Sequence, residues 1–285
     1  MNLTDRIYFA VHLALTVLVC ARWQQVAHGP WYLAWNSAAV VAIVFMARKC
    51  PDGALWEFAH DWLPLVLFTS CFEEVSYLSL ALRGAWHNPQ LIAVESALFA
   101  VPPGEWLRRY SAPWLTELLE FGYCSFYPLY PAVGGVLWWC RLRARFADAF
   151  RRMTDALSIG YLVCYATYLL FPVRSPSHNV GLDAGLPVQS AGLFHFLVSF
   201  VQGHAGVHGN AVPSSHIMLA CVVLVFTFRY FPRVAPWLLV CVLLMSAGAM
   251  YDGYHYAVDV LAGALLGIAV SVPFAVGVDS ISRGG

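Results

Sequence analysis

Long apolar runs separated by short polar segments dominate the hydropathy pattern of the chain. Eight of these runs approach the ~20 residues that an α-helix needs to cross a bilayer. They lie at residues 7–27, 31–47, 62–82, 114–140, 156–172, 213–231, 236–250 and 257–278. The pattern predicts an all-α fold, a polytopic membrane helix bundle with about six to eight transmembrane helices.

The first apolar run has a second interpretation. The run from Ile7 to Ala21 follows Arg6, and a basic start before a short apolar stretch is also typical of a secretory signal peptide. Because no soluble domain follows it, we favour a first membrane helix. We expect residues 1–60 to form an N-terminal transmembrane hairpin and residues 61–285 to form a larger membrane domain, in one structural unit with the hairpin.

Composition and charge support this interpretation and add an orientation. Hydrophobic residues make up 60% of the chain and charged residues 11%, which is far from the composition of a soluble globular protein. Lys and Arg are retained in cytoplasmic loops, and with eight spans 11 of the 16 basic residues fall on the side of both chain ends. The helix ends at Arg174, His216 and His255 then face outward together. Zero net charge and the lack of a basic tail give no reason to expect a nucleic-acid partner.

Two short segments contain side chains that could take part in catalysis, and each precedes an apolar run. In His255-Tyr256-Ala257-Val258-Asp259 the histidine and the aspartate are four residues apart, so on a helix they share one face. A carboxylate in that place can hold the tautomer of a nucleophilic imidazole. In Pro213-Ser214-Ser215-His216 the histidine comes at a helix start, where free backbone N–H groups attract anions. This segment predicts an acid beside a phosphate-sized pocket.

Both segments resemble motifs of the type 2 phosphatidic acid phosphatase (PAP2) superfamily. The first is similar to its closing His-x-x-x-Asp motif with the glycine that follows, here Gly263, and the second to its Pro-Ser-x-His motif. The variant His-Tyr-x-x-Asp-Val is most similar to the branch of inositol phosphorylceramide synthases, sphingomyelin synthases and their bacterial relatives. Residues 61–64 and 103–107 also resemble segments of bacterial members. The resemblance implies a PAP2/haloperoxidase-like core and a catalytic membrane domain over residues 61–285.

The resemblance also implies a mechanism without a metal or another cofactor. His255 would attack phosphorus and form a phosphohistidine, while Asp259 would orient it. His216 would protonate the departing oxygen and then activate water or an acceptor hydroxyl. Ser214 and Ser215 would donate hydrogen bonds to the phosphoryl oxygens.

The implied enzyme is a lipid phosphatase or phosphotransferase. Its substrate would be a phospholipid or isoprenyl phosphate, surrounded by membrane lipids. The resemblance to bacterial members suggests a bacterial inner membrane, with the active site on the periplasmic side.

One arginine that the resemblance leads us to expect among the phosphate-binding residues is missing. Many superfamily phosphatases carry an arginine six residues before the nucleophilic histidine, and this chain has Ala249 there. Arg174, at the outer end of the 156–172 span, is the nearest counterpart and could bind phosphate bidentately. The departure favours the synthase-like branch over the simple phosphatases.

Other polar residues leave alternatives open. Glu73 and Glu74 lie inside the 62–82 span, where ionisable groups are expensive, and adjacent residues cannot share one helix face. With the histidines they could form the proton relay of a transporter, or belong to a non-enzymatic lipid-binding protein; a structural hydrogen-bonding role is equally open. Four histidines near the Pro-Ser-Ser-His segment also permit a metal site, although we favour solvated or substrate-contacting roles. They are His178, His195, His204 and His208.

Two connections between spans are too long for simple turns. They cover residues 83–113 and 173–212, and both fall on the predicted outer side. The first contains a short apolar piece over residues 91–101 that could lie at the membrane interface. Because long connections in compact domains are often functional, we expect both to cover the site.

Overall fold

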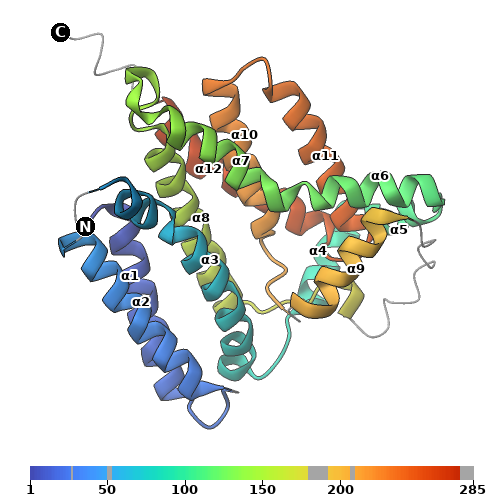
Figure 1. Cartoon of the computed structure of the whole chain (residues 1–285). Helices are drawn as coiled ribbons and strands as arrows, with labels where there is room; N and C mark the ends of the chain where they lie inside the picture. The colour runs from blue at the N-terminus through green and yellow to red at the C-terminus, as the bar shows by residue number, and fades with distance from the viewer. Residues whose placement is uncertain (27, 50–52, 179–191, 206–208, 277–285) are drawn as a thin grey trace.

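The computed structural model describes residues 1–26, 28–49, 53–178, 192–205 and 209–276. These residues form helices, and no strand occurs among them, which confirms the all-α prediction (Figure 1). Within these ranges, five helices contain a segment long and apolar enough to cross a membrane: α1 (Leu3–Ala21), α2 (Gly29–Lys49), α3 (Ala54–Arg83), α8 (Ala149–Leu170) and α12 (Ala257–Val276). The shorter α-helices are α4 (Asn88–Leu98), α5 (Pro103–Arg108), α6 (Pro113–Cys124), α7 (Phe126–Trp139), α9 (Leu193–Ala205), α10 (Ser215–Tyr230) and α11 (Ala235–Tyr251).

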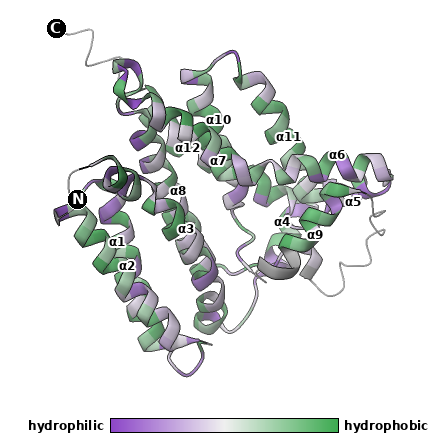
Figure 2. Cartoon of the chain, viewed as in Figure 1, coloured by the Kyte–Doolittle hydropathy of each residue, from purple (hydrophilic) through white to green (hydrophobic). Residues whose placement is uncertain are grey.

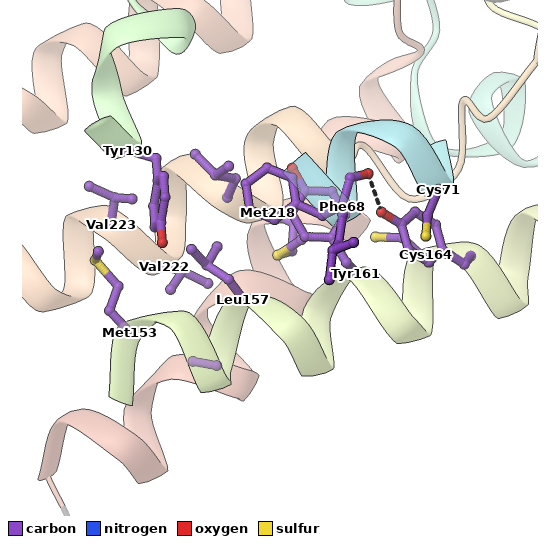
Figure 3. Close-up of a cluster of buried hydrophobic side chains, with 14 of the residues drawn as sticks. Phe68, Cys71, Tyr130, Met153, Leu157, Tyr161, Cys164, Met218, Val222 and Val223 are labelled. Carbon is purple, nitrogen blue, oxygen red and sulfur yellow. Dashed lines mark hydrogen bonds between the residues drawn. The ribbon is translucent and has the colours of Figure 1, made fainter. Parts of the chain in front are cut away.

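Helix α8 occupies the centre of the bundle. It packs against α1, α3, α7, α10 and α12. Of its most apolar 18-residue stretch, 61% is buried inside the protein. Figure 3 shows side chains from α3, α7, α8 and α10 meeting in this core, where Phe68 stacks on Tyr161 with ring centroids 4.6 Å apart. Apolar side chains on the outer helices instead face outward, such as Leu265 at 70% exposure and Trp237 at 75%. Figure 2 shows hydrophobic residues along all of these helices, as a lipid-facing surface requires.

The predicted span 114–140 is divided into two helices. Helix α6 ends at Cys124 and α7 begins at Phe126, with Ser125 between them. Pro128 explains the break, because its nitrogen cannot donate a backbone hydrogen bond to the Cys124 carbonyl across it. Helix α6 packs on α11, whereas α7 packs on α8 and α10. The break lets one apolar run serve two parts of the bundle.

A buried polar network joins the first three helices. The imidazole of His12 on α1 lies 2.6 Å from Asn36 Oδ1 on α2, and Asn36 Nδ2 donates to Glu74 Oε1 on α3 at 2.8 Å. Cys71 Sγ lies 3.6 Å from the other ring nitrogen of His12. All four residues are fully buried, whereas Glu73 is exposed. The two adjacent glutamates thus face different surroundings, as the helix geometry predicts.

The ends of the bundle differ in chemistry. At one end, Arg145 donates to the Tyr230 carbonyl and Arg229 to the Ala275 carbonyl, so basic residues surround the last turns of α10 and α12. The first turns of these two helices, with the end of α8, lie at the other end (Figure 1). Helices α4, α5 and α9, from the two long connections, also gather there. The sequence prediction that Arg174, His216 and His255 share one face agrees with this arrangement.

Candidate active site

The first turns of α10 and α12 are joined directly. The Ser214 amide donates to the Asp259 carbonyl at 3.0 Å. A Cβ atom on Gly263, one turn further along α12, would overlap the Ser214 carbonyl oxygen. A glycine is therefore needed at this position for the two helices to approach so closely. From α8, Tyr168 Oη donates to the Pro213 carbonyl at 2.7 Å and fixes the turn that precedes α10.

His255 is bracketed by two polar partners from the predicted set. Its Nε2 lies 3.0 Å from Ser214 Oγ, and its Nδ1 lies 3.6 Å from Asp259 Oδ2. The same carboxylate oxygen accepts the Tyr256 backbone N–H at 2.9 Å. If Nδ1 carries the proton toward Asp259, Nε2 has the lone pair that a nucleophile requires, and the Ser214 hydroxyl donates to it.

Burial determines the charge of His255. The residue is 6% exposed and lies in the connection between α11 and α12. Desolvation lowers the pKa of His255 to about 4, and a contact with the Ala211 backbone opposes part of this shift. The imidazole is therefore neutral at neutral pH.

His216 lies across a small gap from His255. The two ring centroids are 5.9 Å apart, and the His216 ring packs at 4.4 Å from the Phe126 ring. Among the residues that the structure describes, none gives His216 Nδ1 a hydrogen-bond partner. An oxygen of a group held between the two imidazoles could form that bond.

The start of α10 has donors available beside this gap. Ser214 caps the helix by accepting the Ile217 N–H at 3.4 Å, and Ser215 and His216 follow as the first two helical residues. The first N–H groups of a helix have no acceptor within the helix, and the helix dipole favours an anion there. The arrangement suits a phosphoryl group near His216.

Arg174 lies close to the site but turns toward another surface. Its guanidinium sits 4.7 Å from the Trp86 ring centroid, and it does not line the cavity that contains the two histidines, whereas its neighbour Ser175 does. Asn88 holds the backbone of Arg174 on both sides, accepting its N–H at 3.0 Å and donating to its carbonyl at 2.8 Å. Phosphate contact by this arginine would need a change of side-chain rotamer.

An aromatic cavity of about 310 Å³ extends from the histidines into the bundle. His216, His255, Ser215 and Ser175 form its polar end. Its aromatic wall comes from α3, α6, α7 and α8 and contains Phe68, Phe72, Tyr123, Phe126, Tyr127, Tyr130 and Tyr161. Val201 of α9 and residues 209–211 also line it, so the long 173–212 connection reaches the site as expected. One polar end and one apolar body suit an amphiphilic ligand.

Two residues near the site were missed by the sequence interpretation. Glu95 and Asn88, both on α4, contact the backbone or side chains of the segment that carries His255. The available signal was weak, because Glu95 was only an acidic residue within the short apolar piece assigned to the membrane interface. Nothing in the local sequence links α4 to α12.

Of the four histidines that permit a metal site, only His195 has a described side chain. His195 Nδ1 lies 2.8 Å from Glu120 Oε1 on α6. No group of three or more His, Cys, Asp or Glu side chains that could hold a metal ion occurs among the described residues. His208 and the side chains of His178 and His204 lie outside them.

The fold and this site together define a helical membrane protein with paired histidines at the ends of two adjoining helices. The family model described as the PAP2 superfamily matches residues 89–272, well over half of the chain. The chain therefore belongs to the PAP2 superfamily. Comparison with curated proteins and with solved structures found no match. Membership supports a phosphatase-type enzyme acting on a lipid phosphate, and the match includes both histidine segments.

Proposed function

We propose that this protein is a membrane phosphatase or phosphotransferase that acts on a phospholipid or isoprenyl phosphate through a phosphohistidine on His255. The observation that supports this most is the pair of imidazoles 5.9 Å apart at the polar end of an aromatic cavity. The phosphate would lie between the rings and the lipid chain in the cavity. Inositol phosphorylceramide synthase-like transfer is the form that the His-Tyr-x-x-Asp-Val variant favours.

In the first step, His255 Nε2 attacks phosphorus and the bond to the departing oxygen breaks. A protonated His216 gives its proton to that oxygen, and Asp259 stabilises the positive charge that develops on the His255 ring. In the second step, water or a lipid alcohol attacks the phosphohistidine, the P–N bond breaks, and His216 takes up the proton of the attacking hydroxyl. Each step returns the histidines to the state that the other requires, so the cycle needs no metal.

The donors around the gap support transition-state stabilisation. Charge spreads over the phosphoryl oxygens during transfer, and fixed donors are most effective there. Ser214, Ser215 and the first N–H groups of α10 would supply them, and Arg174 would join after leaving Trp86. The basic residues at the opposite bundle end favour a site on the extracytoplasmic face, which in a bacterium is the periplasmic face of the inner membrane.

The test is turnover by purified protein in detergent with EDTA. The substrates are phosphatidic acid, an isoprenyl diphosphate and an inositol phospholipid, each assayed with and without a lipid alcohol as acceptor. We expect His255→Ala and His216→Ala each to lose turnover by at least ~10³-fold, while His87→Ala, outside the cavity, retains it. Full turnover by His255→Ala on every accepted substrate would refute the mechanism. Release of phosphate indicates hydrolysis, and head-group transfer to the alcohol indicates a synthase.

A further inference from the structure

Glu95 on α4 binds the start of α12 with both carboxylate oxygens. Oε1 accepts the Ala257 backbone N–H and Oε2 accepts the Val258 backbone N–H, each at 3.0 Å. The residue is 3% exposed and lies far from α12 in the sequence. A carboxylate that accepts two backbone N–H groups is both a strong cap and a rigid one, because the two bonds fix its orientation.

Carboxylates accept three backbone N–H groups at the start of α12. Glu95 takes two of its N–H groups, and Asp259 Oδ2 takes that of Tyr256. This helix N-terminus therefore has little capacity left for a substrate anion. The N-terminus of α10, next to His216, can still bind an anion. The start of α12 therefore positions the nucleophile, and the start of α10 binds the anion.

Helix α4 provides a rigid support for this contact. Asn88 lies seven residues before Glu95 and therefore on the same face, and its Nδ2 lies 3.2 Å from Tyr256 Oη. Between them, Leu91 packs in a cluster with Val173 and Tyr256. Helix α4 thus holds the three residues that follow His255, through the Tyr256 side chain and the Ala257 and Val258 backbone.

We propose that Glu95 is a positioning residue for phosphoryl transfer, which holds the backbone after His255 so that Nε2 meets phosphorus in line. This inference rests on the proposed function. His255 immediately precedes a helix turn whose position Glu95 fixes, and misplacement of a reacting atom by about 1 Å can lower a rate by ~10²-fold. Glu95 touches no substrate in this account.

Glu95→Gln provides the sharpest test, because it conserves size but replaces one acceptor oxygen by an N–H₂ group that faces a backbone N–H. Glu95→Asp keeps both acceptors on a shorter arm and serves as the second variant if Glu95→Gln does not fold. Glu105→Gln on α5 is the control, since Glu105 is half exposed and pairs with Arg109 at 3.5 Å. Turnover is measured with the best substrate of the panel, together with inhibition by inorganic phosphate and by vanadate.

The two inhibitors separate positioning from general damage. Phosphate reports the anion site, whereas vanadate resembles the transition state and needs a well-placed nucleophile. We expect Glu95→Gln to lower kcat by roughly 10- to 100-fold and to weaken inhibition by vanadate to a similar extent. KM and inhibition by phosphate should change by less than about twofold. Glu95→Asp should recover part of the loss.

Two results would overturn the role of Glu95. Unchanged kcat in Glu95→Gln would contradict it, and so would a parallel loss of phosphate and vanadate inhibition, which indicates collapse of the whole site. Either result combined with an inactive His255→Ala leaves the proposed function intact. An active His255→Ala would instead contradict the proposed function itself.

Discussion

His255 combines two properties that a histidine at the protein surface does not have together. It is buried enough to stay neutral, and it still lines a cavity. Ser214 and Asp259 contact its two ring nitrogens from different helices. A neutral ring with an oriented lone pair is ready for attack without losing a proton first.

The protonation of His255 gives a prediction at the residue scale. Because burial lowers the pKa of His255 to about 4, the ring should remain neutral as the pH falls from 7 to 5 and take up a proton only near pH 4. NMR titration of histidine-labelled protein, with the His255→Ala spectrum to assign the signal, measures this midpoint. A His255 midpoint near 6.5 would show that the ring is solvated and not held as described.

The two histidine segments could be found from the sequence because each is local. The spacing of His255 and Asp259 alone placed them one helical turn apart, and the Pro-Ser-Ser turn marked a helix start. Glu95 and Asn88 could not be found in this way, since their contacts with α12 depend on tertiary packing. The direction of the Arg174 side chain depends on Trp86 and was equally hidden.

At the scale of elements, the crossing of α10 and α12 sets the distance between the two histidines. Each histidine sits at the start of one of these helices, and Gly263 of α12 lies directly against the Ser214 carbonyl before α10. Any side chain at this position must push the Ser214 carbonyl away. The close approach therefore couples helix packing to catalytic geometry.

Gly263→Ala tests this coupling. The new methyl group would displace α12 from Ser214, and we expect at least a 10-fold loss of turnover and a lower unfolding temperature. Gly135→Ala is the matched control, since a Cβ atom at Gly135 on α7 meets nothing within 4 Å. It should leave turnover unchanged and stabilise the helix by at most about 1 kcal/mol. Equal turnover in both variants would mean that the crossing does not control the site.

Hydropathy located the bundle helices because the bilayer imposes length and apolar character on them. It did not show the break between α6 and α7, although Pro128 carried that information. It also did not predict α9 in the 173–212 connection, where glycine and histidine obscured the helical signal. Helices outside the bundle are stabilised by particular contacts, such as Glu117 accepting the His195 backbone N–H.

At the scale of the whole molecule, the N-terminal helices are attached through polar contacts in the interior. The network of His12, Asn36 and Glu74 joins α1, α2 and α3. Phe72, two residues before Glu74 on α3, lines the cavity, and its ring centroid lies 6.2 Å from that of His216. The geometry favours a structural role for Glu74 over a transport role.

Glu74→Gln distinguishes these roles. Its amide oxygen can still accept from Asn36, so we expect unchanged turnover and an unfolding temperature within a few degrees of wild type. Glu74→Ala leaves the Asn36 donor buried without its acceptor and should destabilise the protein by ~1–3 kcal/mol. Exposed Glu73→Ala is the control. A proton-coupled uptake activity that Glu74→Gln abolishes would favour the transporter hypothesis instead.

The central claim is a covalent phosphohistidine on His255, and rapid-quench trapping with a ³²P-labelled substrate tests it most directly. Wild-type protein should carry label that is stable to alkali and released by acid, and peptide mapping should place it on the segment around His255. The His255→Ala protein should carry none. Substrate turnover without any trapped label, or label that persists in His255→Ala, would contradict the account.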